Sequence, residues 1–562
     1  MDPAPRTALR WHRKAHVVWV YAIVIGLTAT LVIPAASRRE EMIRLVCHVV
    51  EPIASRPTIS RRESWGGLTG ALTRDDAGWD LETCKRSVKV QRRVAHINMV
   101  SHVASDLLGA ATTAAWSSLS DRVGRCRILT VAVVGQALKG LSFLHVLVFP
   151  QSMVRTGGSV LYVGPVVDGL LGGEPLLAAV YTAYLADVTS VDNMAINTVG
   201  FSTVAAAIAV AAPMIGPALV SASGDRLLPF EFTLGLQIIF GLFVWLVIPE
   251  SLSKDKRDTA QAEASQASAA LQRSGRPGAA GDGGAQRSSC ARLGRVIRRA
   301  SHTLMRHSLA PLESLAVFRP VPRQPGDTRK GRDWNLFYLA SVIFLLALAR
   351  EESPEVQYVM FSFGWGQVEL GRRASLIAMW RTATVCSIIP LYRFVVKPFL
   401  VKRIVATAHG DTSEEAPLLS DGGGDAESLQ TRANIVADLV FLGTSILIEC
   451  LGYIAKGANS AGSFWPYAIG TAVALAGAPG SLVLNPLLLE LGPPERPAGR
   501  IFGASAVLSA VGGTLLNSLL FNTVFGATIG WYPPTLFVVA AGLYLIALVC
   551  VILVQAARVP RQ

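Results

Sequence analysis

The sequence predicts an all-α polytopic membrane protein with about 12 transmembrane helices in two six-helix bundles. Of its 562 residues, 51% are hydrophobic and only 16% are charged, which is an unusual composition for soluble domains. The hydrophobic residues are concentrated in segments that are nearly free of charge, and short polar clusters separate these segments. A helix of about 20 apolar residues crosses the hydrocarbon core of a bilayer and satisfies its own backbone hydrogen bonds there.

The first half of the chain contains six predicted spans and forms a predicted N-terminal bundle at 17–250. Its first span, from Val17 to Ala35, is too long and too far from the terminus for a cleaved signal peptide, so we expect an uncleaved anchor. A long outer loop at 37–93 follows it. The other five spans are predicted at 94–115, 128–149, 159–184, 197–220 and 232–249.

The second half repeats this pattern and predicts a C-terminal six-helix bundle at 334–555. Charged residues interrupt the apolar pattern between 350 and 392, which leaves the boundaries loose there. The six spans are predicted at 334–352, 374–392, 434–454, 464–489, 500–524 and 533–554.

Two polar segments are predicted to be largely unstructured cytoplasmic loops. The linker at 251–333 is rich in Ala, Gly, Ser and Arg, and the loop at 400–430 is acidic and rich in Gly. Within the linker, basic and apolar residues alternate from Leu293 to Phe318, so this stretch is either a basic amphipathic helix on an anionic leaflet or disordered.

The distribution of basic residues predicts the orientation. Four of them place the N-terminus, 1–16, in the cytoplasm, and an even number of spans returns the C-terminus, 556–562, to the same side. The basic residues in 37–93 do not oppose this orientation, because long loops translocate largely regardless of charge. The four N-terminal residues are Arg6, Arg10, Arg13 and Lys14.

Several functional classes are excluded. The formal net charge is +13, but the arginines lie between apolar segments and form no stripe interleaved with aromatic residues, so we expect no nucleic-acid partner. The seven cysteines form no CxxC pair, and no metal or cofactor is expected. We also expect no enzyme, because HExxH, GxSxG and Gly-rich phosphate-loop motifs are absent from suitable contexts.

Two cysteines lie together in the polar segment after the first span. Cys47 and Cys84 form a possible loop-closing disulfide if this segment faces an oxidising compartment. Two free thiols remain the alternative.

The most specific local pattern lies between the second and third spans, at 117–127. Here the sequence resembles the major facilitator superfamily (MFS), whose motif at this connection reads G-x-x-x-D-R-x-G-R-R/K. The sequence departs from it at Ser117 and Cys126, and Arg127 supplies a basic residue one position later. The matching residues are Asp121, Arg122, Gly124 and Arg125.

These residue types suit a conformational gate. A carboxylate near a helix N-terminus is stabilised by exposed backbone N–H groups, glycine allows a tight turn, and arginine reaches neighbouring carboxylates. Such contacts can form in one conformational state and break in another. An ordinary basic cytoplasmic loop is the alternative.

Further segments carry the same resemblance. The sixth span ends in Pro249-Glu250-Ser251, as is common in the superfamily. The fourth span and its continuation through Asp187 are similar to the branch that contains fungal drug/H⁺-antiporter-like members and proton-coupled folate transporter relatives, although the arginine usual after this aspartate is missing. Gly216-Pro217 resembles part of the antiporter motif and gives slight support for export.

Ionisable residues within spans are costly in hydrocarbon, so each is a candidate for a functional site. Asp168 and Glu174 are six residues apart, about 120° around a continuous helix, and are not expected to act on one face together. The resemblance implies a central cavity in which either one carries a proton or meets a cationic substrate, with Arg381 as the counter-charge from the other half. Interhelical pairs that only fix packing remain the alternative. The candidates are Asp106, Asp168, Glu174, Arg381 and Glu449.

A possible sorting signal lies in the acidic loop. Glu414, Leu418 and Leu419 fit an acidic dileucine pattern, which must be cytosolic to be read. The expected location is the plasma membrane or a vacuolar or lysosomal membrane.

Together, the resemblance implies a secondary active transporter that moves a small organic solute by alternating access, with proton-coupled efflux as the favoured detail. A proton-coupled importer is the alternative, and a sensor or scaffold that keeps the fold without transporting is a second one. The expected partners are the solute, protons and the lipid bilayer, and the chain is expected to be a monomer.

Overall fold

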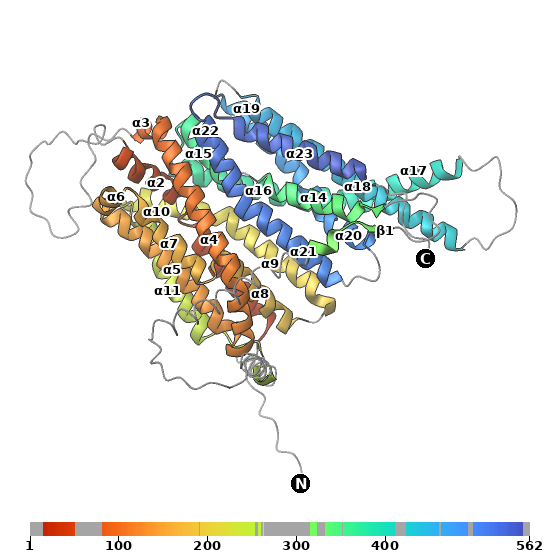
Figure 1. Ribbon diagram of the computed structural model, residues 1–562, viewed down its shortest axis with the longest axis horizontal. Coiled ribbons are helices and arrows are strands. Elements are labelled where there is room, and N and C mark those ends of the chain that lie inside the picture. Colours follow the sequence, from red (N-terminus) through yellow and green to blue (C-terminus); the bar gives the residue numbers. More distant parts are fainter. Residues whose placement is uncertain are drawn as a thin grey trace, which may run out of the picture. The chain divides into compact units, whose positions relative to one another are not determined.

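The computed structural model confirms the predicted all-α polytopic architecture (Figure 1). Its described regular structure is helical except for one pair of two-residue strands. Among the described residues, ten helical segments are long and apolar enough to cross a membrane. The description covers 15–50, 81–189, 191–252, 257–259, 262, 315–322, 332–350, 352–410, 423–459, 462–492 and 498–554.

Two further helices occupy the remaining predicted spans. Helix α4 (Val88–Val123) has 36 residues but carries several charges, and α14 (Asn335–Leu348) is apolar but has only 14 residues. The chain divides into two compact units, of which unit 1 comprises Met1–Trp79 with Val100–Ala310, and unit 2 comprises Asp80–Met99 with Pro311–Gln562.

Unit 1 is built around a core of buried aliphatic and aromatic residues from α1, α5, α8 and α11. The central side chains include Ile23, Leu129, Leu176 and Val244, each at most 1% exposed. The elements are α1 (Val17–Val32), α2 (Ala35–Val50), the part of α4 from Val100, α5 (Arg125–Val148), α6 (Pro150–Thr156), η2 (Ser159–Tyr162), α7 (Val163–Leu170), α8 (Gly173–Val188), α9 (Val191–Ala211), η3 (Ala212–Met214), α10 (Ile215–Ser223) and α11 (Leu228–Leu246).

The predicted outer loop at 37–93 is partly helical, which corrects the sequence-based boundaries. Helix α2 follows directly after Pro34, and α3 (Leu81–Arg86) and the start of α4 occupy the other end; 51–80 lie outside the described residues. The sequence of α2 is polar on average, but Ile43, Val46 and Cys47 are at most 1% exposed. An amphipathic helix of this kind gives no signal in a search for continuous apolar runs.

The predicted fourth span is also not one continuous helix. It ends as α7 at Leu170 and resumes as α8 at Gly173. Gly172 and Gly173 have φ values of 98° and 54°, a conformation that residues with a Cβ rarely adopt.

Unit 2 has its own core, to which α14, α18, α20, α21 and α23 contribute. Helices α18, α19 and α23 lie side by side in Figure 1. The elements are α3, the start of α4, η4 (Leu315–Phe318), β1 (Val321–Pro322), β2 (Arg332–Asp333), α14, α15 (Glu352–Phe363), α16 (Gln367–Leu391), η5 (Tyr392–Val396), α17 (Lys397–Gly410), α18 (Gly423–Gly457), α19 (Phe464–Gly477), η6 (Ala478–Val483), α20 (Leu484–Glu490), α21 (Ala498–Ala510), η7 (Val511–Leu516), α22 (Asn517–Thr528) and α23 (Thr535–Leu553). Strands β1 and β2 pair antiparallel, with Val321 opposite Asp333.

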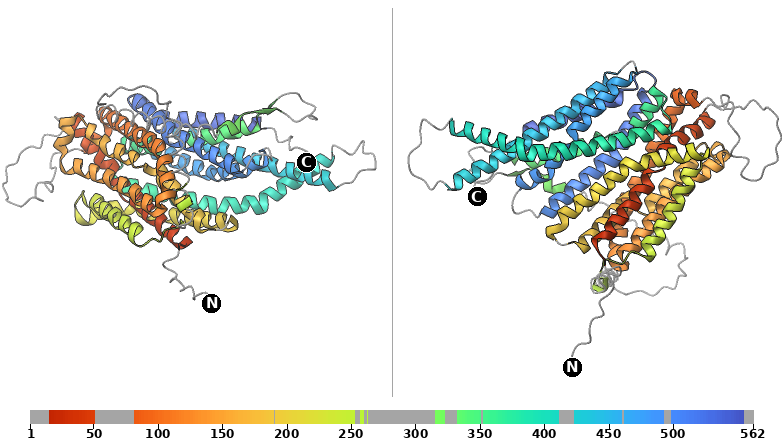
Figure 2. Two further views of the ribbon diagram at one scale, coloured as in Figure 1. Left: turned by 60° about the horizontal axis from the view of Figure 1, so that its bottom comes forward. Right: turned by 180° about the vertical axis from the view of Figure 1, so that it is seen from behind.

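The two segments predicted as unstructured loops are partly ordered. Phe318, in the predicted linker, is 5% exposed and packs in the core of unit 2, whereas most of the proposed amphipathic stretch lies outside the described residues. In the acidic loop, α17 and the start of α18 form a helical pair that projects from the rest of unit 2 (Figures 1 and 2). Val401 packs there against Ala433 and Ala437, so a small apolar contact orders residues whose average composition is polar.

Helices α14 and α15 are separated by a break that a neighbouring helix closes. The side-chain amide of Asn517, at the start of α22, donates to the Leu348 carbonyl at 2.8 Å and to the Arg350 carbonyl. These carbonyls have no partner within a continuous helix, and Asn517 supplies the missing donors.

Candidate functional site

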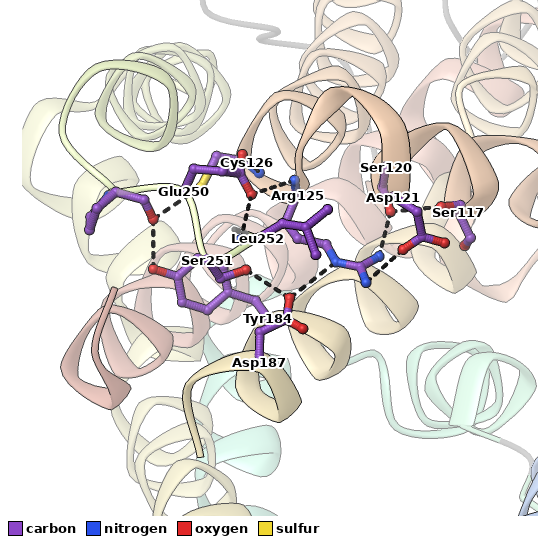
Figure 3. Close-up of polar contacts among 11 residues, drawn as sticks. Ser117, Ser120, Asp121, Arg125, Cys126, Tyr184, Asp187, Glu250, Ser251 and Leu252 are labelled. Atoms are coloured by element: carbon purple, nitrogen blue, oxygen red, sulfur yellow. Dashed lines mark hydrogen bonds and ion pairs between the residues drawn. The ribbon is translucent and has the colours of Figure 1, made fainter. Parts of the chain in front are cut away.

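The connection between α4 and α5 forms a compact polar cluster in unit 1, which we call the Arg125 junction (Figure 3). The Glu250 carboxylate accepts hydrogen bonds from the backbone N–H of Arg125 at 2.7 Å and of Cys126 at 3.2 Å. A negative side chain thus satisfies orphan N–H groups at the N-terminus of α5 and interacts favourably with the helix dipole.

Gly124 makes this approach possible. Its φ is 124°, and a Cβ at this position would collide with the Glu250 carboxylate. Glycine is therefore required here both for the backbone conformation and for the close approach of Glu250.

The Arg125 side chain joins two carboxylates from different helices. Its guanidinium lies 2.7 Å from Asp121 on α4 and 3.4 Å from Asp187 on α8, and it donates to the Ser120 hydroxyl at 2.7 Å. Ser251 donates to Asp187 at 2.9 Å. The junction thus connects α4, α5, α8 and the segment after α11.

The structure brings together most of the motif residues that the sequence singled out. Asp121 and Arg125 are paired and Gly124 forms the turn, whereas Arg122 and Arg127 are exposed and Arg127 has no polar partner among the described residues. Sequence reasoning did not assign Glu250 and Asp187 to this site, although the Pro-Glu-Ser ending contained the signal for Glu250.

A second polar cluster lies inside unit 1 around Asp168. This residue is fully buried, and its Oδ2 accepts hydrogen bonds from the Lys139 ammonium at 2.8 Å and from the Ser105 hydroxyl at 3.2 Å. Its Oδ1 has no hydrogen-bond partner in the described structure. Sequence reasoning missed Lys139. A single lysine within the predicted span 128–149 is costly in hydrocarbon and therefore indicates a paired or functional residue.

Asp106 and Glu174 belong to the same electrostatic neighbourhood. Asp106 interacts electrostatically with Glu174, Lys139 and Asp168. The expectation that Asp168 and Glu174 act apart assumed a continuous helix, and the break between α7 and α8 makes that assumption wrong. Glu174 is exposed in the first turn of α8, where an acidic residue is also favourable for the helix itself.

The two candidates in the second half both lie in unit 2. Arg381 on α16 and Arg350 are electrostatic neighbours of Glu449 on α18, which also interacts with Tyr544. The counter-charge for Glu449 is therefore found within its own unit.

A buried ionic network in unit 2 was not predicted, and we call it the Glu355 network. The Glu355 carboxylate on α15 lies 2.8 Å from the Arg373 guanidinium and 3.0 Å from the Lys456 ammonium. The Tyr467 hydroxyl donates to Glu355 at 2.9 Å and accepts from Arg373 at 2.8 Å. Burial by itself raises the pKa of Glu355, but Arg373 and Lys456 outweigh it and lower the pKa from 4.5 to about 2.

A smaller pair lies near the middle of α18. Asp438 accepts a hydrogen bond from the Tyr392 hydroxyl at 2.5 Å and lies 2.8 Å from the Lys397 ammonium. The Tyr392 ring stacks on Phe441 with 3.9 Å between ring centroids. This pair fixes the one-turn π-helix η5 against α18, and such π-helical turns occur frequently at functional sites.

The remaining candidates are placed as follows. Cys47 and Cys84 are each disulfide-bonded and buried, whereas Cys126, Cys386, Cys450 and Cys550 are free. Glu414, Leu418 and Leu419 lie outside the described residues. No cluster of three or more His, Cys, Asp or Glu residues that could hold a metal ion occurs within the described ranges.

Comparison with known proteins adds one informative relative. No protein-family model matches the chain. The chain is 24% identical over 478 residues to the MFS-type transporter avaJ of Aspergillus versicolor, and the aligned region covers 83% of this chain and 79% of that protein. The chain is thus similar over most of its length to one MFS-type transporter.

That relative is named as a transporter. Two solved structures are similar to this chain over most of its length. The human organic anion transporter MFSD10 (TETRAN) is 15% identical, with 97% of this chain and 100% of that chain covered and a TM-score of 0.49. The xylose transporter XylE from E. coli, in a partially occluded inward open conformation, is 11% identical, with 95% and 98% covered and a TM-score of 0.49.

Proposed function

We propose that the protein is a secondary active transporter that exports a small organic solute by alternating access in exchange for protons. The sequence relationship to an MFS-type transporter and the ten candidate spans support the transport class. The buried Asp168–Lys139 pair is the observation that carries the proposal of proton coupling.

The chemistry of this pair suits a proton site. A carboxylate that is fully buried is stable in its charged form only when it is paired. Protonation of Asp168 removes its charge and releases the Lys139 ammonium, whose distance to Oδ2 is 2.8 Å. Asp106 then becomes the nearby carboxylate that can attract Lys139 or a cationic solute. Binding of a proton thereby changes the charge that the solute meets.

The Arg125 junction supplies a contact that can depend on the conformational state. The Asp121 side chain is 49% exposed, and an ion pair at such a site contributes only about 0–1 kcal/mol. The Asp121–Arg125 pair can therefore break at little cost when the helices of unit 1 move. This property fits a conformational gate of the kind that alternating access requires.

Export is the favoured direction, and it rests on the resemblance of Gly216-Pro217 to the antiporter motif. A Cβ on Gly216 would collide with the Ile33 carbonyl, so the glycine also has a packing role there. Import by proton symport is the alternative, and the two differ in the direction of proton movement relative to the solute.

The finer resemblance, location and assembly complete the proposal. We propose that the chain belongs near the fungal drug/H⁺-antiporter-like members and the proton-coupled folate transporter relatives. We also propose that it is a monomer and that it resides in the plasma membrane or in a vacuolar or lysosomal membrane. We also propose that Cys47 and Cys84 are bonded to each other. The dileucine signal is tested by imaging a tagged protein with Leu418→Ala and Leu419→Ala, and an unchanged distribution removes it.

A transport screen in a cell strain that lacks endogenous exporters identifies a solute. The solute is then added to proteoliposomes that contain a pH-sensitive dye. We expect solute-dependent proton movement in the wild type and its loss in Asp168→Asn, with Glu231→Gln, an exposed acid in unit 1, as the matched control. Wild-type proton coupling in Asp168→Asn contradicts the proton site. Solute binding without flux in the wild type identifies a sensor instead.

A further inference from the structure

One pocket in unit 2 is separate from all the sites described above. It has a volume of about 320 Å³ and lies where the last turns of α15, the end of α3 and the segments after α18 and α22 meet. This volume is at the lower end of the range of about 300–1,000 Å³ that is typical of small-molecule sites. The lining residues are Arg86, Tyr358, Phe361, Ser362, Asn459, Gly462, Pro533 and Pro534.

The pocket combines an apolar wall with a few polar groups. Phe361, Pro533 and Pro534 supply apolar surface. Asn459 and Tyr358 are 3% and 1% exposed, and the Asn459 amide donates to the Tyr358 hydroxyl at 3.4 Å. Burial raises the pKa of Tyr358, so this hydroxyl stays protonated and remains a hydrogen-bond donor at neutral pH. This composition is typical of a site for a small organic molecule.

The backbone around the polar groups is held in place independently of any ligand. The Asn459 amide donates to the Ser463 carbonyl at 2.6 Å, and its carbonyl oxygen accepts from the Ser463 N–H at 2.8 Å. The Tyr358 ring packs edge to face on Phe537, with 4.9 Å between ring centroids. A ligand therefore meets polar groups that are already ordered, which lowers the entropic cost of binding.

The charge at this end of unit 2 is positive. Glu355 is shared by two cations, Arg373 and Lys456, and Glu82 is paired with Lys85 at 3.1 Å. Arg86 is exposed and makes no ion pair with any described residue. The Glu355 network thus carries one more positive than negative charge, and Arg86 in the pocket wall has no carboxylate partner among its described neighbours.

We infer that this pocket binds a small organic anion, with its carboxylate on Arg86 and its apolar body against Phe361, Pro533 and Pro534. The planar guanidinium binds a carboxylate through two parallel hydrogen bonds. The Tyr358 hydroxyl is an additional donor within the pocket, and the Ser362 side chain holds it by a hydrogen bond. The inference is independent of the proposed transport function, because it involves neither Asp168 nor the Arg125 junction.

The test uses the full-length protein in detergent and two probes of nearly equal shape, 2-naphthoate and its neutral analogue 2-naphthamide. Isothermal titration at constant ionic strength is expected to show saturable binding of 2-naphthoate and much weaker binding of 2-naphthamide. Arg86→Gln is expected to weaken 2-naphthoate binding at least about tenfold, and Ser362→Ala about two- to tenfold. Arg393→Gln, which removes an exposed arginine of η5 elsewhere in unit 2, is expected to bind as the wild type does.

Unliganded thermal unfolding temperatures show whether each variant is folded. Asp168→Asn is expected to retain 2-naphthoate binding, which separates this site from the proposed proton site. The inference is overturned if the wild type binds 2-naphthoate more weakly than about 1 mM, if both probes bind equally, or if a folded Arg86→Gln variant keeps the wild-type affinity.

Discussion

The Arg125 junction in unit 1 and the Glu355 network in unit 2 both join several helices through charged side chains, but they differ in their access to solvent. In the junction, the Asp121 side chain is 49% exposed. In the network, the side chains of Glu355 and Lys456 are 10% and 3% exposed. Exposed ion pairs form and break at little cost, whereas a buried charge that loses its partner is strongly destabilising. The Asp121–Arg125 pair is therefore suited to a contact that changes between states, and the network to one that persists.

The largest expected effect is on stability, at the buried network. Glu355→Gln removes the one negative charge and leaves Arg373 and Lys456 buried together, so we expect a loss of about 3–5 kcal/mol of stability. Thermal unfolding of the purified protein measures this loss. Glu369→Gln, which changes an acid at the exposed start of α16, is the control, and an equally small effect of both substitutions contradicts the assigned role of the network.

The pH dependence of stability gives a second test of the same network. The pKa of Glu355 is lowered from 4.5 to about 2 in the folded protein. Its stabilising contribution is therefore fully present above pH 4.5 and is lost as the pH falls toward 2, with a total of a few kcal/mol. We expect the wild-type unfolding temperature to fall more steeply over this pH range than that of Glu355→Gln. Parallel curves for the two proteins exclude a lowered pKa at this carboxyl.

An intermediate effect is expected at the part of the junction that is fixed. Glu250→Gln keeps the shape of the side chain but removes the charge that caps α5, so we expect a loss of about 1 kcal/mol. Unfolding temperatures measure it, and the exposed substitution Glu231→Gln provides the baseline. No difference between the two variants shows that the charge of Glu250 does not contribute to the cap.

The smallest expected effect on stability is at the exposed side of the junction. Asp121→Asn is expected to change stability by less than about 1 kcal/mol, while changing the rate of solute exchange in proteoliposomes because the Arg125 contact is weakened. Glu355→Gln is expected to lower stability strongly and to change the exchange rate of the folded protein little. A large loss of stability in Asp121→Asn, with an unchanged exchange rate in the folded fraction, removes the distinction between the two regions.

The fold was predictable because lipid imposes a strong constraint on sequence. Long apolar segments identified most of the spans, but α2 was missed because its apolar residues occupy only one face. The break between α7 and α8 was missed because Gly172 and Gly173 read equally well as residues of a continuous span. Local motifs predict reliably what depends on neighbouring residues, and they say less about backbone conformation.

The candidate sites were predictable to the extent that they are local in sequence. Asp121, Gly124 and Arg125 lie within five residues, so the motif contained them, whereas the contact of Arg125 with Asp187 spans 62 residues. Glu355 pairs with Lys456 across 101 residues, and the charges near Glu355 were interpreted only as an interruption of the apolar pattern. Without information on pairing, a single sequence shows that a charge is unusual but not which residue compensates it.

The amide of Asn517 has a mechanical consequence for unit 2. The Leu348 carbonyl is buried together with the Asn517 amide that donates to it, and a buried carbonyl that loses its donor costs free energy comparable to a lost hydrogen bond. Any sliding of α22 along α14 would leave the buried Leu348 carbonyl without the Asn517 donor. This hydrogen bond thereby couples the two helices, and we expect them to move together.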